Sequence, residues 1–249
     1  INTDNSVYIQ DTITQNRIIG RSYVANLSEK TIIITNDIYH KPKNELLGIN
    51  NSKTIIEAIK KDERVLGVAP KINAQVFYNV GAVDLTGAIF GIDPVEENRL
   101  FKFSDYVTSG NYIDLKNIPN SIVLGKGVAT KMMANVGDVI QVTTSKGDQV
   151  ALRVVGIFQS GIQDLDNVQS YCSLTTTQKI LGQPSNYITD IQVKLKDILW
   201  APVVAKEYRK VYELNAVDIQ TANSLSILEV RKTLSYPLPI SPNIFVSRK

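Results

Sequence analysis

The sequence predicts an α+β fold in which two α/β segments at the ends of the chain enclose a β-rich segment. Three observations support this class. The strictly alternating stretch Asp190–Leu195 predicts a half-buried strand, and apolar residues at helical spacing follow it. The β-branched run Thr31–Thr35 precedes a second helical pattern. Between these segments, glycines interrupt short apolar runs, and Ser145–Asp148 has the composition of a tight hairpin turn.

The first third of the chain reads as strand, helix, strand. Arg17–Tyr23 is a weak strand candidate, and Thr31–Thr35 is a strong one because Asn and Asp follow it directly. Ser52 is a suitable N-cap for a helix with isoleucines on one face and two lysines near its end. Val65–Val68 and Ala74–Val80 then predict two separate strands.

The middle third is expected to be mostly β with one helix at Gly125–Ala134. The strands Val139–Thr143 and Val150–Phe158 flank the Ser145–Asp148 turn and predict a hairpin. A short further helix is indicated toward the end of this segment, where Thr175 and Gln178 have capping-box spacing.

The last third returns to strand, helix, strand. Gly182 lies where a helix C′ residue is expected, and Asp190–Leu195 follows as a strand. Ala216–Gln220 is expected to form a closing strand. The intervening helix is predicted from five residues at helical spacing, Trp200, Val204, Tyr208, Val211 and Tyr212.

The composition is that of an ordinary globular protein. Of 249 residues, 43% are hydrophobic and 20% are charged, which excludes general disorder. The net charge of +3 is small and the lysines are dispersed, so no nucleic-acid partner is expected. The single cysteine, Cys172, forbids an internal disulfide bond. Neither catalytic nor cofactor-binding nor metal-binding residues are predicted.

Several residues invite a chemical reading that the sequence does not favour. His40 is the only histidine and lies in a polar loop, so it is expected to be an exposed structural residue. A hydrolase with Cys172 as nucleophile would need His40 as its base, because the chain has no other histidine. Cys172 is instead expected to be a buried apolar residue. Asp93 precedes Pro94 and is expected to lie in a turn.

The acidic residues around this turn could suggest a carboxylate pair, but nearby Arg99 and Lys102 indicate a solvated, charge-balanced surface. The cluster comprises Asp84, Asp93, Glu96 and Glu97. Gly125–Gly127 lacks a complete phosphate-loop pattern, so its glycines are expected to relieve steric crowding. The aromatic and methionine candidates Met132, Met133, Phe77 and Phe158 are expected to fill the core.

The middle of the chain resembles the extracytoplasmic domain of ABC-transporter permeases of the LolC/LolE and MacB type. Gly91–Glu97 resembles a GxDPxxE stretch of LolC/LolE proteins, and Ile122–Gly127 followed by Val136–Asp138 resembles their ILGxxxA…VGD segment. Gly156–Phe158, with Asp164 further on, resembles a second landmark. The returning strand Asp190–Leu195 completes the set, and the similarity covers roughly residues 17 to 232.

The resemblance implies a MacB-like periplasmic core: a discontinuous Porter-like α/β subdomain with an inserted β-rich Sabre-like subdomain. The expected boundaries are residues 1–83 and 187–232 for the Porter-like parts and 84–186 for the Sabre-like insert. Residues 233–249 form a tail of unknown role that contains three prolines and is not expected to span a bilayer.

The resemblance also implies how the protein works. Membrane helices are expected before residue 1 and after about residue 232, with this domain on the periplasmic side of the inner membrane. The implied partners are a cytoplasmic ATPase subunit, a second permease subunit, same or sister, and a lipoprotein or amphiphilic cargo. The domain itself would be no enzyme and would couple ATP hydrolysis to cargo movement.

One departure from the family bears on the partner. LolC-type subunits carry a long excursion between the strands equivalent to Val139–Thr143 and Val150–Phe158, and it recruits a lipoprotein chaperone. Here only the Ser145–Asp148 turn joins them, so a LolE-like or more general MacB-like permease is favoured. The alternative is an FtsX-like domain that regulates an extracytoplasmic partner such as a cell-wall hydrolase.

Overall fold

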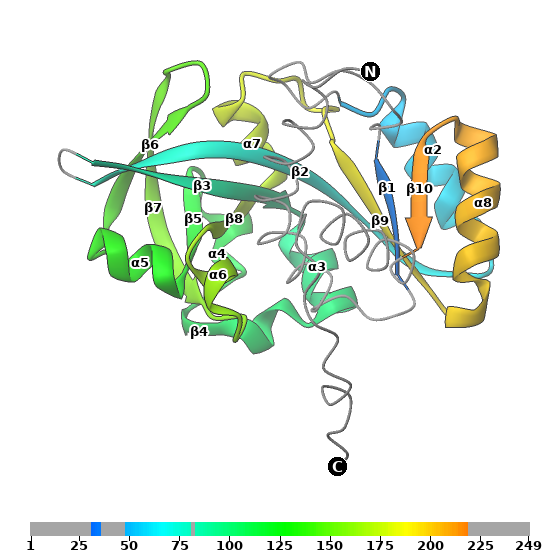
Figure 1. Cartoon of the computed structure of the whole chain (residues 1–249), viewed down its shortest axis with the longest axis horizontal. Coiled ribbons are helices and arrows are strands. Elements are labelled where there is room, and N and C mark those ends of the chain that lie inside the picture. The colour runs from blue at the N-terminus through cyan, green and yellow to red at the C-terminus, as the bar shows by residue number, and fades with distance from the viewer. Residues whose placement is uncertain (1–30, 36–47, 81–82, 219–249) are drawn as a thin grey trace, which may run out of the picture.

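A computed structural model describes residues 31–35, 48–80 and 83–218. Within them, ten strands form one sheet in the order β10-β1-β9-β2-β3-β8-β5-β7-β4, and β6 pairs with both β2 and β7 (Figure 1). The strands are β1 (Thr31–Thr35), β2 (Val65–Val80), β3 (Val83–Ile92), β4 (Val107–Gly110), β5 (Ser121–Gly125), β6 (Val139–Thr144), β7 (Gln149–Phe158), β8 (Gln169–Ser173), β9 (Asp190–Leu195) and β10 (Asn215–Asp218).

Helices flank the sheet along its length. They are α2 (Ser52–Lys60), α3 (Pro94–Phe101), α4 (Asp114–Asn117), α5 (Lys126–Met132), α6 (Gln163–Asp166), α7 (Leu174–Ile180) and α8 (Ala201–Tyr212), with 3-10 turns η1 (Phe103–Tyr106) and η2 (Ile198–Trp200). Among the described residues, no helix has both the length and the apolar character needed to cross a bilayer.

The sheet carries two lobes with separate cores. The first lobe consists of β1, β9, β10 and the start of β2, and α2 and α8 pack on it through residues such as Ile59, Val193 and Val204. The second lobe contains β3 to β8 with α4 to α7, and its core includes Val76 and Leu124. The two lobes occupy opposite ends of the sheet (Figure 1). This arrangement confirms the predicted α+β class.

The strand β2 belongs to both lobes. Its first half, Val65–Lys71, pairs with β9, and its second half, Lys71–Val80, pairs with β3. The prediction of two strands was therefore wrong. Pro70 lies between the two predicted segments and directly precedes the first residue paired with β3, a position where a missing N–H costs little. The predicted boundary between residues 83 and 84 falls at the start of β3, after β2 has ended, and it stays a prediction.

Several local predictions are confirmed by the structure. The β6–β7 hairpin, β9 and α8 occupy the expected segments, and Gly182 follows α7 with φ of 63°. β10 ends at Asp218 within the described residues. The strand candidate Arg17–Tyr23 and His40 lie outside them.

The expectation of a single helix in the middle third was wrong, because α3, α4 and α6 were not anticipated. α4 and α6 have four residues each, too few to show a helical period. Two caps also differ from prediction. Ser52 is the first helical residue, and its hydroxyl donates to the Asn186 carbonyl at 2.8 Å. Ser173, rather than Thr175, caps α7 by accepting from the Thr176 N–H.

Candidate functional site

Asp93 directly precedes helix α3, which lies where the two lobes meet. Asp93 is extended, with φ of −87° and ψ of 109°, and its carboxylate accepts from the backbone N–H groups of Val95 at 3.0 Å and Glu96 at 3.3 Å. Pro94 occupies the first helical turn, where a missing N–H is harmless. The turn predicted for Asp93 is thus the N-cap of a helix, with two glutamates in the first turn as the helix dipole favours.

A pocket of about 390 Å³ lies beside this helix start, between α3, α4 and α7. Its apolar lining comes from Ile92, Pro94, Leu115, Ile118, Pro119 and Leu174. Lys116 and Lys179 stand among its polar lining residues, and the Lys179 ammonium donates to the Asn120 amide oxygen at 3.3 Å. The pocket could hold an apolar group of a ligand that also carries a hydrogen-bond acceptor for the lysines. Among its lining residues no nucleophile is paired with a base.

A buried ion pair joins α3 to β2. Lys71 Nζ lies 2.6 Å from Glu97 Oε1, and the two side chains are only 2% and 7% exposed. Glu97 Oε2 has no hydrogen-bond partner among the described residues. Burial raises the pKa of Glu97 and lowers the pKa of Lys71, and each partner's charge opposes the shift of the other.

This pair corrects the expected acidic surface cluster. Glu96 does lie on the surface, paired with Arg99 at 2.7 Å, but Glu97 points inward. The signal was present in the sequence: Glu97 shares its helix face with Leu100 and Phe101, three and four residues further on, which are also buried. The missing information was the partner, because Lys71 is on a strand 26 positions away.

The C-terminal end of α3 contacts the first lobe. The ammonium groups of Lys71 and Lys194 lie 5.7 and 5.4 Å from the centre of the Phe101 ring, within the range of cation–π attraction. Lys194 of β9 also donates a hydrogen bond to the Leu100 carbonyl. A side chain at Gly67 would overlap Leu100, so the glycine allows α3 to approach β2 closely. We call this contact between α3, β2 and β9 the lobe junction.

The lobe junction contains polar atoms that lack partners. Both amide atoms of Gln192 and the side-chain oxygen of Asn73 are buried and unpaired within the described part of the chain. Thr189, in contrast, accepts from the Asn73 N–H at 2.9 Å and donates to the Asp190 carboxylate at 2.6 Å. The hydroxyl of Thr189, directly before β9, thus links this end of β9 to Asn73 of β2.

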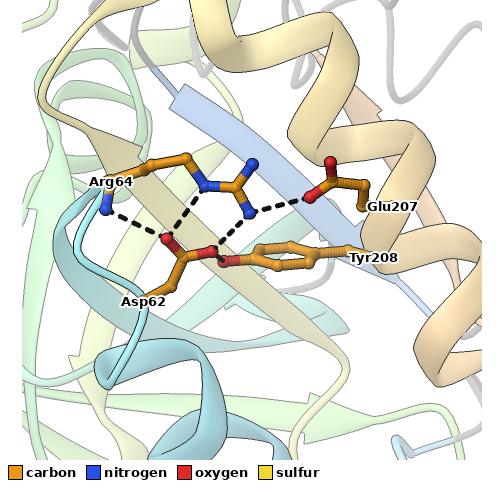
Figure 2. A network of polar contacts seen from close by, with 4 residues as sticks. All are labelled: Asp62, Arg64, Glu207 and Tyr208. Atoms are coloured by element: carbon orange, nitrogen blue, oxygen red, sulfur yellow. Dashed lines mark hydrogen bonds and ion pairs between the residues drawn. The ribbon is translucent and has the colours of Figure 1, made fainter.

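A second polar network fixes α8 to the turn between α2 and β2 (Figure 2). The Asp62 carboxylate accepts from the Arg64 side chain at 2.8 and 3.0 Å and from the Tyr208 hydroxyl at 2.8 Å. Arg64 also pairs with Glu207 at 2.7 Å. Hydrogen bonding from Arg64 lowers the pKa of Asp62 well below its usual range, whereas burial raises the pKa of Tyr208.

The other predicted candidates have structural roles. Cys172 of β8 is fully buried, and burial raises the pKa of its thiol, so the residue is the expected apolar core member. A side chain at Gly125 or Gly127 would collide with α6 or the residue after it, which confirms steric relief. The described residues contain no group of three or more potential metal ligands.

The expectation that the methionines and phenylalanines fill the core was wrong for Met133 and Phe77. Met132 is partly buried and Phe158 is fully buried, but Met133 is 82% exposed at the C-cap of α5 and Phe77 is 40% exposed. In α8, Val204 and Tyr208 form the buried face as predicted. Trp200, which precedes that helix, is 41% exposed, and Val211 is 68% exposed.

Comparison with known protein families shows to which family this chain belongs. The family model of the MacB-like periplasmic core domain matches residues 8–210, more than three quarters of the chain. The chain belongs to this family. Its relatives include the lipoprotein-releasing system transmembrane protein LolC of Neisseria meningitidis serogroup B, 24% identical over 177 residues, and LolC of Xylella fastidiosa strain 9a5c, 26% identical over 186 residues.

The matches cover 66% and 70% of this chain but only 42% and 44% of the two LolC proteins, so the chain spans less than half of their length. As a MacB-like periplasmic core domain it also shares the fold of solved structures. The periplasmic region of MacB from Actinobacillus actinomycetemcomitans has a TM-score of 0.55 at 17% identity, covering 84% of this chain and 97% of that one. The extracellular domain of the ABC-type transporter YknZ from Gram-positive bacteria has a TM-score of 0.52 at 14% identity, covering 75% and 98%.

The suspected relationship and fold are therefore confirmed: this is a periplasmic domain of the LolC/MacB permease type. Its family is a component of transporter permeases and not a classical enzyme family. The landmark Gly91–Pro94 ends β3 and begins α3, and Ile122–Gly125 is the buried strand β5. In this chain both segments contribute to packing, as their glycines and apolar residues suggested.

Proposed function

We propose that this chain is the extracytoplasmic domain of an ABC permease subunit in the inner membrane. A cytoplasmic ATPase would bind the membrane part of the subunit, and hydrolysis would drive release of a lipoprotein or export of an amphiphilic substrate. The match of residues 8–210 to the periplasmic core family carries this proposal. The LolC relatives, named as lipoprotein-releasing proteins, favour lipoprotein release as the specific activity.

The two-lobed sheet suits a domain that transmits motion. β1 begins and β10 ends in the first lobe, so movement of flanking membrane helices would reach that lobe first. β2 continues from the first lobe into the second without a break, and the buried Lys71–Glu97 pair joins it to α3. A second permease subunit, same or sister, would supply the opposing domain, and cargo would be displaced as the two domains approach.

The parent gene tests the permease assignment. One membrane helix upstream of residue 1 and three downstream of residue 249 are expected. An upstream signal peptide together with a stop codon directly after Lys249 would refute the assignment and leave a secreted binding protein.

Reconstitution of the intact permease with its ATPase in proteoliposomes tests the activity. Replacing the domain by a flexible linker is expected to abolish release of a fluorescent lipoprotein while ATP hydrolysis continues. Undiminished release by this variant would contradict the proposed role. The matched control is the Lys146→Ala variant, which changes an exposed residue of the β6–β7 turn and is expected to release cargo normally.

The FtsX-like alternative, regulation of an extracytoplasmic partner, is compatible with one observation that equally fits a permease without a chaperone-binding excursion. The β6–β7 connection is a tight turn closed by hydrogen bonds between Thr144 and Asp148, and it offers no excursion for a lipoprotein chaperone. A defined protein partner that binds the purified domain without lipid or lipoprotein would support this alternative. If that partner and a lipoprotein competed for binding to the domain, the transport function would be favoured instead.

A further inference from the structure

We infer that one end of the first lobe contacts the lipid bilayer directly through a small apolar surface. The surface, which we call the apolar tip, consists of Leu66, Leu199, Trp200 and Val203. The inference rests on the proposed function, because the bilayer is identified from the position of the tip relative to the segments that would enter the membrane.

The strand register places the tip where the described chain enters and leaves the first lobe. Thr31, the first residue of β1, pairs with Lys194 near the end of β9, and Asp218, the last residue of β10, pairs with Ile32. The residue after β9 follows the same edge, since the Lys196 N–H donates to the Arg64 carbonyl beside the start of β2. The lower right of Figure 1 shows this end of the sheet.

The residues of the tip are exposed although they are large and apolar. Leu199 is 78% exposed and Val203 56%, while Leu66 and Trp200 are 48% and 41% exposed. Trp200 and Val203 are three positions apart at the start of α8 and therefore lie side by side on the helix surface. Leu66 lies on the adjoining strand, next to Val65, which pairs with Leu195.

The tip is held in place by the fold around it. The Asp197 carboxylate accepts from the Leu199 N–H at 3.0 Å and caps η2. Behind the exposed side chains, Ala201 and Val204 anchor α8 in the core of the first lobe. The Asp62–Arg64–Tyr208 network then fixes α8 to the start of β2. A rigid apolar surface loses little conformational freedom on binding.

The chemistry of the tip matches the membrane interface. Tryptophan is enriched at the level of the lipid headgroups because its ring is apolar and its N–H is polar. Leucine and valine beside it would reach the upper acyl region. In a permease both chain segments that flank this lobe would lead to membrane helices, so the tip would face the bilayer at short range.

Trp200 is the only tryptophan of the chain, so its fluorescence reports on the tip alone. The full 249-residue chain is titrated with vesicles of phosphatidylethanolamine and phosphatidylglycerol. We expect a blue shift of the emission, and quenching when brominated phosphatidylcholine is included. The variants Leu199→Gln and Val203→Gln keep the reporter and are each expected to lower the partition coefficient about tenfold. Circular dichroism verifies that both remain folded.

The matched control is Val139→Gln, because Val139 is 56% exposed in the second lobe, far from the tip. The inference would be overturned if vesicles caused no spectral change, or if the Leu199→Gln and Val203→Gln variants bound vesicles as strongly as the unmodified chain. A blue shift that depends on protein concentration and appears without vesicles would also overturn it, because it would indicate that a second copy covers the tip. A parent gene without membrane helices would instead refute the proposed function, and vesicle binding would then describe a peripheral membrane protein.

Discussion

At the scale of single residues, the Lys71–Glu97 pair has the largest expected effect on stability. Lys71→Met would leave Glu97 buried without its ion-pair partner, and Glu97→Leu would remove that partner from the buried Lys71. We expect each change to lower the free energy of unfolding by about 3–5 kcal/mol. The double variant Lys71→Met with Glu97→Leu is expected to cost less than either single change, because no uncompensated charge remains.

Urea unfolding of the four proteins forms a double-mutant cycle that measures this coupling. Additive effects of the two changes would show that the pair does not act as a unit. Arg99→Ala serves as the control, since its partner Glu96 is on the surface, and it is expected to cost less than about 1 kcal/mol.

Asp62 gives a pH dependence of defined sign. Its pKa is lowered in the folded protein, mainly by hydrogen bonds from Arg64, so it contributes stability above its unfolded pKa of about 4. That contribution is lost as the pH falls toward the folded pKa. We expect the difference in unfolding free energy between the wild type and Asp62→Asn to be constant from pH 5 to pH 7 and to shrink below about pH 4. A difference that does not change with pH would exclude this role.

At the scale of elements, α3 depends on its cap. Asp93→Ala removes the acceptor for the Val95 and Glu96 N–H groups and is expected to destabilise the protein by about 1 kcal/mol, whereas Asp93→Ser should retain most of the stability. Thermal unfolding measures both variants. Equal melting temperatures for the serine and alanine variants would contradict capping.

The turn between β6 and β7 depends on Gly147, whose φ is 91° and around which a Cβ would meet no atom within 4 Å. The cost of Gly147→Ala would therefore come from the backbone alone, and we expect about 1–2 kcal/mol in urea unfolding. Lys146→Ala at the neighbouring position is the control. A neutral Gly147→Ala variant would indicate that the hairpin adopts another turn.

The elements that the sequence predicts well are those whose signal is local. Asp190–Leu195 alternates within six residues, and the β6–β7 turn is contained in four, so neither needs knowledge of distant residues. α3 was missed although Asp93, Pro94 and Glu96 form a typical helix start, because Gly91 and Pro94 also suit a turn. Glu97 could not be assigned to the interior, since its burial depends on Lys71 of another element.

At the scale of the whole molecule, the predicted discontinuous subdomain can be tested by excision. Lys71 pairs directly with Asp190 in an antiparallel ladder, so residues 72–189 can be replaced by a two-residue Asn-Gly turn without stretching the chain. We expect the remaining first lobe, with Ile59 and Val204 in its core, to unfold cooperatively by circular dichroism. A variant without a cooperative transition would show that the second lobe is required for the first.

The sequence order of the pieces was predictable from the resemblance, but the spatial order of the sheet was not. β8 lies between β3 and β5, and β7 lies between β5 and β4, through pairings that no local pattern encodes. The apolar tip was also unpredictable, because Trp200 has the spacing of the buried Val204 and Tyr208 but precedes the helix and is exposed.

The unbroken strand β2 gives the molecule a mechanical property. Its 16 residues extend over about 50 Å at roughly 3.3 Å per residue, from its root beside the start of β1 and the end of β10 to the far hairpin with β3. A tilt of only 10° at the root would sweep that hairpin through about 9 Å, because displacement grows in proportion to the length of the arm. Small angular changes near a membrane would thus become large linear displacements at the opposite end, carried by one continuous strand.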